Sequence, residues 1–122
     1  MKKWTYEAGR QSDGSVVATI NIECEGAIQP FPLHHFVLHS PTGFEMGWNG
    51  LGPADLAYSI LIHWFLSYKF SLEEAQEEAQ AHHQEFKRAF VAKERDHLVI
   101  SDSDIEKWWI GQEEKVEAAR AI

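Results

Sequence analysis

The sequence is poor in cysteine, and this shortage excludes a disulfide scaffold. Cys24 is the only cysteine, so no disulfide can form within the chain, which is typical of proteins in a reducing compartment. We expect Cys24 to be a small buried apolar residue rather than a reactive thiol. The first residues also lack the apolar run of a signal peptide, because Glu7, Arg10 and Asp13 interrupt them. Together these absences predict a cytoplasmic protein.

Long apolar runs are missing as well, and so is an excess of basic residues. The most apolar segment, residues 54–70, contains Asp55, His63 and Lys69, so it predicts a buried core helix rather than a membrane span. Eleven lysine and arginine residues stand against nineteen aspartate and glutamate residues, which gives a net charge of -8. That charge opposes contact with phosphate groups, so we expect no direct nucleic-acid binding and no membrane partner.

The composition is otherwise that of an ordinary globular protein. The chain has 122 residues, of which 44% are hydrophobic and 25% are charged, a balance that supports a buried core. No internal repeat, low-complexity run or linker divides it. Residues 1–122 are therefore predicted to form a single domain.

The first half of the sequence alternates between apolar and polar residues, as strands do. The alternation predicts four strands, at residues 4–8, 16–22, 33–40 and 44–48. Gly14 suits the turn that would join the first two strands into a hairpin. Pro30 and Pro32 are interpreted as breaking the next region into a loop. The economical arrangement is a four-stranded antiparallel meander.

The second half changes to a helical period of about 3.6 residues. It predicts helices roughly over residues 53–67 and 71–92, a short extra strand near 97–100, and a third helix after residue 103. Pro53 at the first helical position and Asp55 in the first turn would begin the first helix. Capping boxes would begin the other two helices, at Ser71–Glu74 and Ser103–Glu106. The predicted fold class is α+β, an antiparallel sheet packed by about three helices.

Residues 40–57 are the most constrained part of the sequence. Gly43, Gly47, Gly50 and Gly52 supply half of the chain's eight glycines. Such density is expected where the backbone takes a positive φ or passes close to another group. We therefore expect a positive φ in at least one of the last three of these glycines.

Residues 43–57, GFEMGWNGLGPADLA, resemble the signature GFEWGYGGSGPADLA of a family of small uncharacterised bacterial and phage domains. A second block, similar to the downstream half of that family, lies at residues 83–92, 98–100 and 105–108. The resemblance covers about residues 38–110 and departs at Met46 and Leu51, where the family usually has a tryptophan and a small polar residue. It implies a domain of unknown function carried by phages, plasmids and gene cassettes, with an accessory or interaction role and no assigned catalytic residues.

The glycine segment also contains a candidate ligand site, formed by Glu45, Trp48, Asn49 and Asp55. The two carboxylates could do acid–base chemistry if an apolar setting raised the pKa of one of them. The alternative is that Glu45 faces solvent and the glycine turn is purely structural. Nucleotide binding is disfavoured, because the segment lacks both the lysine of a phosphate-binding loop and the GxGxxG spacing.

Seven histidines suggest a metal site, but their spacing does not fit one. His35 and His39 would share a strand face about 13 Å apart at ~3.3 Å per residue. His82 and His83 would point in different directions on a helix. We therefore predict surface or structural histidines, no bound metal and no cofactor. Cys24 and the distant histidines do not form a recognisable catalytic triad either.

Trp108 and Trp109 are adjacent on the predicted third helix, so both cannot face the same core. We predict that one of them lies at a dimer interface or at the surface for a protein partner. Residues 71–122 carry thirteen acidic and seven basic residues, so the acidic surface is mostly helical. The leading interpretation is a non-enzymatic protein-binding accessory module from a mobile genetic element. The alternatives are a small enzyme or small-molecule-binding protein with a site at the Gly47–Asp55 loop, and an acidic inhibitor that mimics DNA.

Overall fold

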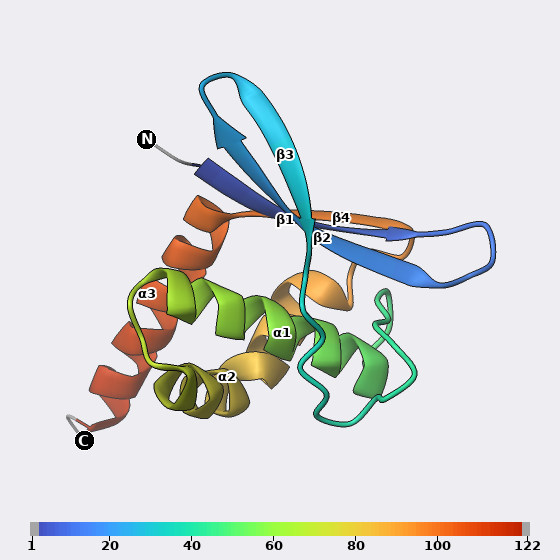
Figure 1. Cartoon of the computed structure of the whole chain (residues 1–122). Coiled ribbons are helices and arrows are strands. Elements are labelled where there is room, and N and C mark those ends of the chain that lie inside the picture. The colour runs from blue at the N-terminus through green and yellow to red at the C-terminus, as the bar shows by residue number, and fades with distance from the viewer. Residues whose placement is uncertain (1–2, 121–122) are drawn as a thin grey trace.

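The computed structural model describes residues 3–120 as one antiparallel sheet with the helices on a single face (Figure 1). The strands are β1 (Lys3–Arg10), β2 (Val16–Cys24), β3 (Ala27–Pro32) and β4 (His97–Ser101). The helices are α1 (Leu51–Ser67), α2 (Leu72–Phe86), the π-helical segment η1 (Lys87–Val91) and α3 (Asp102–Arg120). The strand order within this described range is β3-β2-β1-β4, so the predicted α+β fold with four antiparallel strands and three α-helices is confirmed.

Every second side chain of the strands packs against the helices. In β1 and β2 alternate residues are buried, and Tyr6 lies opposite Ile20 across the antiparallel pair. The turn between these strands contains Gly14 at a φ of 89°, so the predicted hairpin is confirmed. β4 pairs with the other side of β1 and places Ile100 opposite Tyr6 on the same buried face.

The third strand lies at residues 27–32, so the prediction of a loop at Pro30 and Pro32 is wrong. β3 is an edge strand, and just beyond it the Leu33 N–H donates to the Ala18 carbonyl of β2 at 3.0 Å. Because N–H groups alternate in direction along a strand, positions 30 and 32 face away from β2. Proline is tolerated there because its missing N–H removes no hydrogen bond of the sheet.

Residues 33–40 and 44–48 are not strands, which corrects two of the four strand predictions. Apart from an isolated bridge at Phe44, this part of the chain is a loop. Four of its N–H groups, at residues 36 and 38–40, find partners in side chains of α1 rather than in a neighbouring strand, as when the Phe36 N–H donates to Ser59 Oγ at 2.9 Å. The fourth strand of the sheet is instead β4, at the position predicted for the short extra strand.

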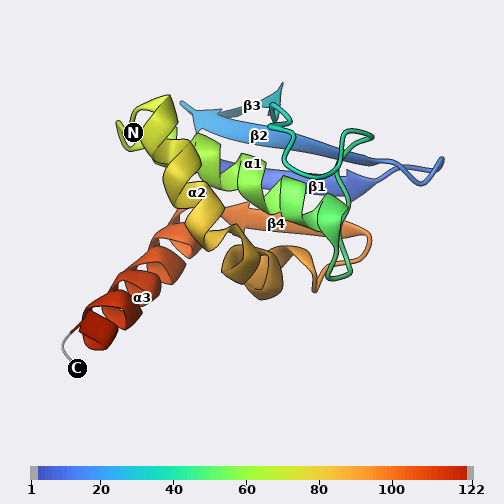
Figure 2. The same ribbon diagram turned by 90° about the horizontal axis from the view of Figure 1, so that it is seen from below.

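α1 confirms the predicted buried helix, although it starts earlier than expected. The helix begins at Leu51 with Gly50 as its N-cap, so Pro53 occupies the third helical position rather than the first, and Asp55 lies beyond the first turn. Nearly every residue from 52 to 65 is buried, because α1 lies between the sheet and α2 (Figures 1 and 2). None of the helices within residues 3–120 combines the length and the apolar composition needed to cross a lipid bilayer.

Capping boxes begin the other two α-helices. Before α2, the Ser71 hydroxyl accepts the Glu74 N–H at 3.1 Å, and the Glu74 carboxylate accepts the Ser71 N–H at 2.9 Å, as predicted. The capping box of α3 is formed by Ser101 and Asp104 rather than by residues 103–106, because the helix begins earlier than predicted. Both helices thus satisfy N–H groups that would otherwise lack partners in the first turn.

The tip of the β2–β3 hairpin and the second half of α3 both extend beyond the core (Figure 1). Cys24 lies at the hairpin tip and is exposed, so the prediction of a buried cysteine is wrong. The helices do not reach that part of the sheet, which leaves its side chains in solvent. In α3, every residue from 113 to 120 is exposed.

Close packing requires glycine at position 47, in the loop of residues 43–50 that we call the glycine loop, and at position 52, in the first turn of α1. Gly47 has a φ of 82°, which confirms the expected positive φ, and its N–H donates to the Val91 carbonyl at 3.0 Å. A Cβ atom at Gly47 would lie 2.7 Å from the Cα of Arg95, and one at Gly52 would lie 2.6 Å from the Cβ of Glu45. A larger residue at either position would therefore force its neighbour to move.

Gly47→Ala should lower the free energy of unfolding by about 2 kcal/mol, because the new methyl group meets the backbone of Arg95 and because alanine is strained at a positive φ. Gly111→Ala is the matched control. Gly111 lies within α3 and an added Cβ has nothing within 4 Å, so alanine should stabilise the protein by up to about 1 kcal/mol. Urea unfolding of the three proteins measures both changes, and equal stability of Gly47→Ala and wild type would contradict the close packing.

Candidate functional site

Part of the predicted ligand site lies in a surface depression that we call the glycine-loop cleft. The cleft forms where the loop before α1 meets the end of β1 and the turn before β4. It is lined by Arg10, Glu45, Met46, Gly47, Trp48, Arg95 and Asp96. Glu45 and Trp48, two of the four candidate ligand residues, therefore share one cleft.

Arg10 connects the segments that form this cleft through its hydrogen bonds. Its guanidinium donates to the Glu45 carboxylate at 3.1 Å, and to the carbonyls of Gly14 at 2.9 Å, Met46 at 3.2 Å and Arg95 at 3.2 Å. The side chain thereby joins β1, the β1–β2 turn, the glycine loop and the turn before β4. Glu45 is engaged in an ion pair, and the two basic and two acidic side chains of the cleft balance in charge. The cleft therefore has little electrostatic attraction for a charged ligand.

Trp48 is the accessible aromatic residue of the cleft. It is 52% exposed, and its ring lies against Gly50 so closely that a side chain at that position would overlap it. Asn49 is exposed beside it but does not line the cleft. An exposed indole offers a flat apolar surface on which a ligand ring can stack. The ligand role of Glu45, Trp48 and Asn49 stays a prediction.

Asp55 lies elsewhere, inside the molecule. Its fully buried carboxylate accepts hydrogen bonds from the His35 ring at 2.9 Å and from the N–H groups of Leu38 at 3.1 Å, His39 at 2.8 Å and Ser40 at 3.0 Å. Both oxygens are engaged, and the residue has no exposed surface to offer a ligand. Asp55 therefore fixes the preceding loop onto α1, away from the glycine-loop cleft.

The surroundings of Asp55 also decide its ionisation. Burial alone would raise the pKa of this carboxyl, but the hydrogen bonds from His35 and from the three backbone N–H groups outweigh the burial and lower the pKa. Acid–base chemistry between Glu45 and Asp55 would need a raised pKa on one of them. The lowered pKa instead keeps Asp55 ionised, as an acceptor of four hydrogen bonds.

Two histidines lie within hydrogen-bond distance of side chains of β1. His97 Nε2 lies 2.6 Å from the Glu7 carboxylate on the open face of the sheet. The Tyr6 hydroxyl lies 2.7 Å from Nδ1 of His63 on α1. Burial lowers the pKa of His63, which favours the neutral ring that accepts this hydroxyl. Within residues 3–120, no group of three histidine, cysteine or acidic residues is placed to hold a metal ion.

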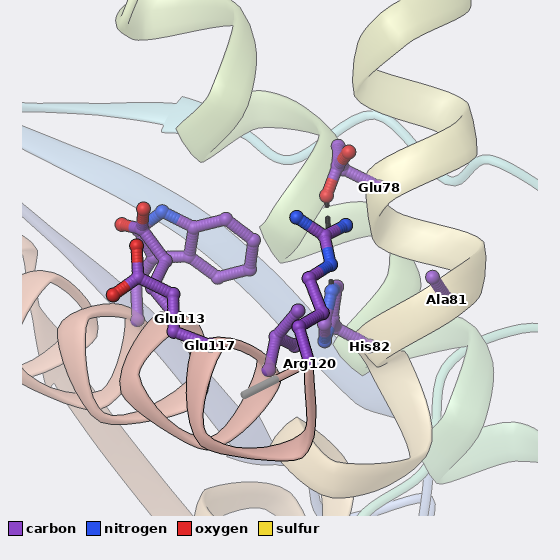
Figure 3. A pocket seen from close by; sticks show the side chains of 8 residues that line it. Glu78, Ala81, His82, Glu113, Glu117 and Arg120 are labelled. Atoms are coloured by element: carbon purple, nitrogen blue, oxygen red, sulfur yellow. Dashed lines mark ion pairs between the residues drawn. The ribbon is translucent and has the colours of Figure 1, made fainter. Parts of the chain in front are cut away.

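A second depression, which we call the α2–α3 groove, separates the two helices of its name (Figure 3). It is lined by Glu78, Ala81, His82, Trp109, Glu113, Val116, Glu117 and Arg120. Trp109 and Val116 give the groove an apolar surface. Three carboxylates surround this surface, and one of them, from Glu78, lies 3.7 Å from Nε2 of His82. The arrangement is an apolar strip with an acidic rim.

Trp108 and Trp109 both reach aromatic residues of the core, and both remain partly exposed. Trp109 packs edge-on against Phe65 with the ring centroids 5.0 Å apart. Trp108 packs in the same way against Phe86 at 5.1 Å. α3 thus contacts α1 and α2 through neighbouring positions, and Trp109 lines the α2–α3 groove whereas Trp108 does not. An interface role for either tryptophan stays a prediction.

Sequence reasoning missed the remaining residues of the α2–α3 groove. Its α3 residues are 109, 113, 116, 117 and 120, and each has another member of the set three or four positions away, which marks one face of a helix. That spacing could have identified one wall. Glu78 and His82 form the opposite wall from α2, and no local pattern places them beside α3.

A model of a family described as "Family of unknown function (DUF6166)" matches residues 6–111. The match includes the glycine loop, α1, α2 and both adjacent tryptophans, and it ends within α3. No curated protein and no solved structure matches the chain. Because the family description names no activity, ligand or partner, a function has to be argued from the residues of the chain itself.

Asp55→Asn should lower the free energy of unfolding by about 3 kcal/mol, because an amide cannot replace a buried carboxylate that accepts four hydrogen bonds. The lowered folded pKa means that this stabilisation is present above the pKa of unfolded aspartate, about 3.9, and is lost as the pH falls through the folded value. The stability gap between wild type and Asp55→Asn should therefore be constant near neutral pH and should shrink in acid.

Glu77→Gln is the control for this variant, because Glu77 is an exposed acid on α2 and its loss should cost less than about 0.5 kcal/mol. Urea unfolding at several pH values measures all three proteins. A gap below about 1 kcal/mol at neutral pH would show that Asp55 does not hold the loop.

Proposed function

The chain belongs to the family of unknown function that its residues 6–111 match, and we propose that it is a non-enzymatic protein-binding accessory module. The observation that carries this proposal is the α2–α3 groove, an apolar strip inside an acidic rim (Figure 3). The resemblance of its glycine segment to domains carried by phages, plasmids and gene cassettes supports an accessory role on a mobile genetic element. The groove is where the protein partner would bind.

The charge of the groove favours a basic partner. Glu78, Glu113 and Glu117 contribute three carboxylates, against one guanidinium from Arg120. Residues 71–122 carry thirteen acidic and seven basic residues, so the surrounding helical surface adds to the negative potential. Complementary charge speeds association and disfavours acidic competitors. We infer that the partner presents lysine or arginine residues around one apolar side chain.

Trp109 gives the groove a rigid centre. Its indole packs against Phe65 and, with ring centroids 4.9 Å apart, against His82. A partly buried aromatic ring that is already fixed loses little conformational freedom on binding, which makes it a favourable centre for an interface. Val116 is 39% exposed and extends the apolar surface along α3. A single large apolar side chain of the partner would cover both residues.

A second copy of the chain is a poorer occupant of the groove. The chain has a net charge of -8, and its own α3 would bring Glu113 and Glu117 against an identical acidic rim. Like charges at close range oppose such pairing. A basic partner is therefore favoured over the homodimer that the adjacent tryptophans also suggest.

Small-molecule binding at the glycine-loop cleft is the second candidate, and the exposed indole of Trp48 favours it. Glu45 is paired with Arg10, and Asp55 is buried elsewhere. Such a site would therefore act by stacking a ligand on the indole rather than by acid–base catalysis.

Replacing Glu113 and Glu117 together with lysine should abolish capture of the partner and leave the fold intact, because both side chains are exposed. Affinity capture from a bacterial lysate, identification of the captured protein, and titration of that protein with wild type and variant measure the effect. We expect the affinity to fall about tenfold or more, and the wild-type affinity to decrease as the salt concentration rises.

Replacing Glu23 and Glu25 with lysine is the matched control, since it makes the same change of charge at the tip of the β2–β3 hairpin. This control should keep full capture. Trp109 is left unchanged because its loss would also remove packing from Phe65. If both double variants capture the partner equally well, or if the partner segment is acidic, the proposal is wrong.

A further inference from the structure

β3 and β4 form the two edges of the sheet (Figure 2), and their sequences differ. β3 forms one edge, and Pro30 and Pro32 remove two of its outward N–H groups. β4 forms the other edge and contains no proline. One edge is therefore closed to an added strand by its sequence, whereas the other keeps its hydrogen-bonding groups.

The pairing of β1 with β4 identifies which groups of β4 are free. Just before β4, the Arg10 N–H donates to the Asp96 carbonyl at 2.9 Å. Backbone N–H and C=O groups alternate in direction along a strand, so the N–H and C=O groups of Leu98 and Ile100 also face β1. The residues between them consequently direct their N–H and C=O groups away from the sheet.

These outward residues are His97 and Val99. No strand within the described residues 3–120 pairs with this side of β4. Ser101 does not extend the row, because the Asp104 carboxylate accepts its N–H at 3.1 Å. The free edge is short, with one N–H and one C=O group on each of two residues. Val99 is 54% exposed, and residues 97–99 line an open recess at this edge.

A recess for side chains, which we call the β4-edge groove, lies beside these backbone groups. It is lined by Ala89, Phe90, Lys93, Glu94, His97, Leu98 and Val99. Phe90 packs on Phe86 with the ring centroids 4.9 Å apart, which gives the wall on η1 a fixed position. The small side chain of Ala89 leaves room beside that ring. Free backbone groups and an apolar recess thus occur side by side.

We propose that β4 accepts an extended segment of a partner protein as an added strand, with one apolar side chain of that segment in the β4-edge groove. This site is separate from the α2–α3 groove and does not depend on it. His97 and Val99 supply the main-chain hydrogen bonds, which fix an extended backbone whatever its sequence. Because side chains alternate along a strand, every second residue of the segment faces Ala89 and Phe90 and is therefore apolar.

A second copy of the chain fits this edge poorly. Antiparallel pairing of two β4 strands through their free groups would set His97 of each copy opposite Val99 of the other. It would also bring Glu94 and Asp96 of each copy close to Asp102 of the other, and like charges at close range are destabilising. α3 also begins directly after β4, so a folded helix would follow the paired strand at once. An extended segment of another protein avoids both conflicts.

Val99→Pro tests the proposal, with Val99→Ala as its matched control. Proline removes the outward N–H of residue 99, as Pro30 removes one from β3. That N–H of Val99 has no partner among residues 3–120. Linear peptides selected from a random display library against the wild-type protein serve as probes, and fluorescence polarisation measures their dissociation constants. We expect Val99→Pro to weaken binding about tenfold or more, and Val99→Ala to change it by less than about threefold.

Amide hydrogen exchange tests whether β4 accepts an added strand even if Val99→Pro does not fold. In the free wild-type protein the N–H of Val99 should exchange quickly and those of Leu98 and Ile100 slowly, and a selected peptide should slow the exchange of Val99. The proposal is overturned if the Val99 N–H is already protected in the free protein, or if no selected peptide protects it. Equal binding of the peptides to folded Val99→Pro overturns it as well. The proposal is also overturned if the wild-type protein is a dimer that Val99→Pro converts to a monomer, because a second copy of the chain then covers the edge.

Discussion

The buried carboxylate of Asp55 is the interaction on which the course of the surface loops depends. Removing a charge from water is unfavourable unless hydrogen bonds replace the lost solvent, and here one imidazole and three backbone N–H groups do so. The loop that follows β3 is thereby fixed against α1, and the glycine loop continues from a defined position. The glycine-loop cleft therefore depends on a carboxylate that does not line it.

Elements whose signals are local could be predicted from the sequence. Ser71 and Glu74 mark the start of α2 because a capping box is complete within one turn of helix. The strand predicted at residues 33–40 was wrong for a non-local reason. Its backbone N–H groups bond to Asp55 and Ser59 on α1, and no pattern within the segment reveals those partners. β3 was missed because a proline breaks a strand only where its N–H would face a neighbour, and pairing with β2 decides that direction.

The same distinction applies to the candidate sites. Glu45 and Trp48 line one cleft because they are close in sequence on one tight loop. Asp55 was grouped with them by sequence distance, although it belongs to the buried surface of α1. The α2–α3 groove could not be predicted, because its walls are far apart in sequence and meet only through tertiary packing. Trp109 connects the core with the α2–α3 groove, since it packs on Phe65 of the core and also lines the groove.

The pairing of the first strand with the last one has a consequence for synthesis of the chain. Glu7 and His97 are hydrogen-bonded across 90 positions, so β1 and β2 can form their hairpin long before β4 has left the ribosome. Until then the nascent chain exposes an unpaired edge of β1, next to Tyr6 and other residues that are buried in the finished fold. We therefore expect β4 to complete the sheet late in folding, and we expect aggregation to compete with folding while the edge of β1 is unpaired.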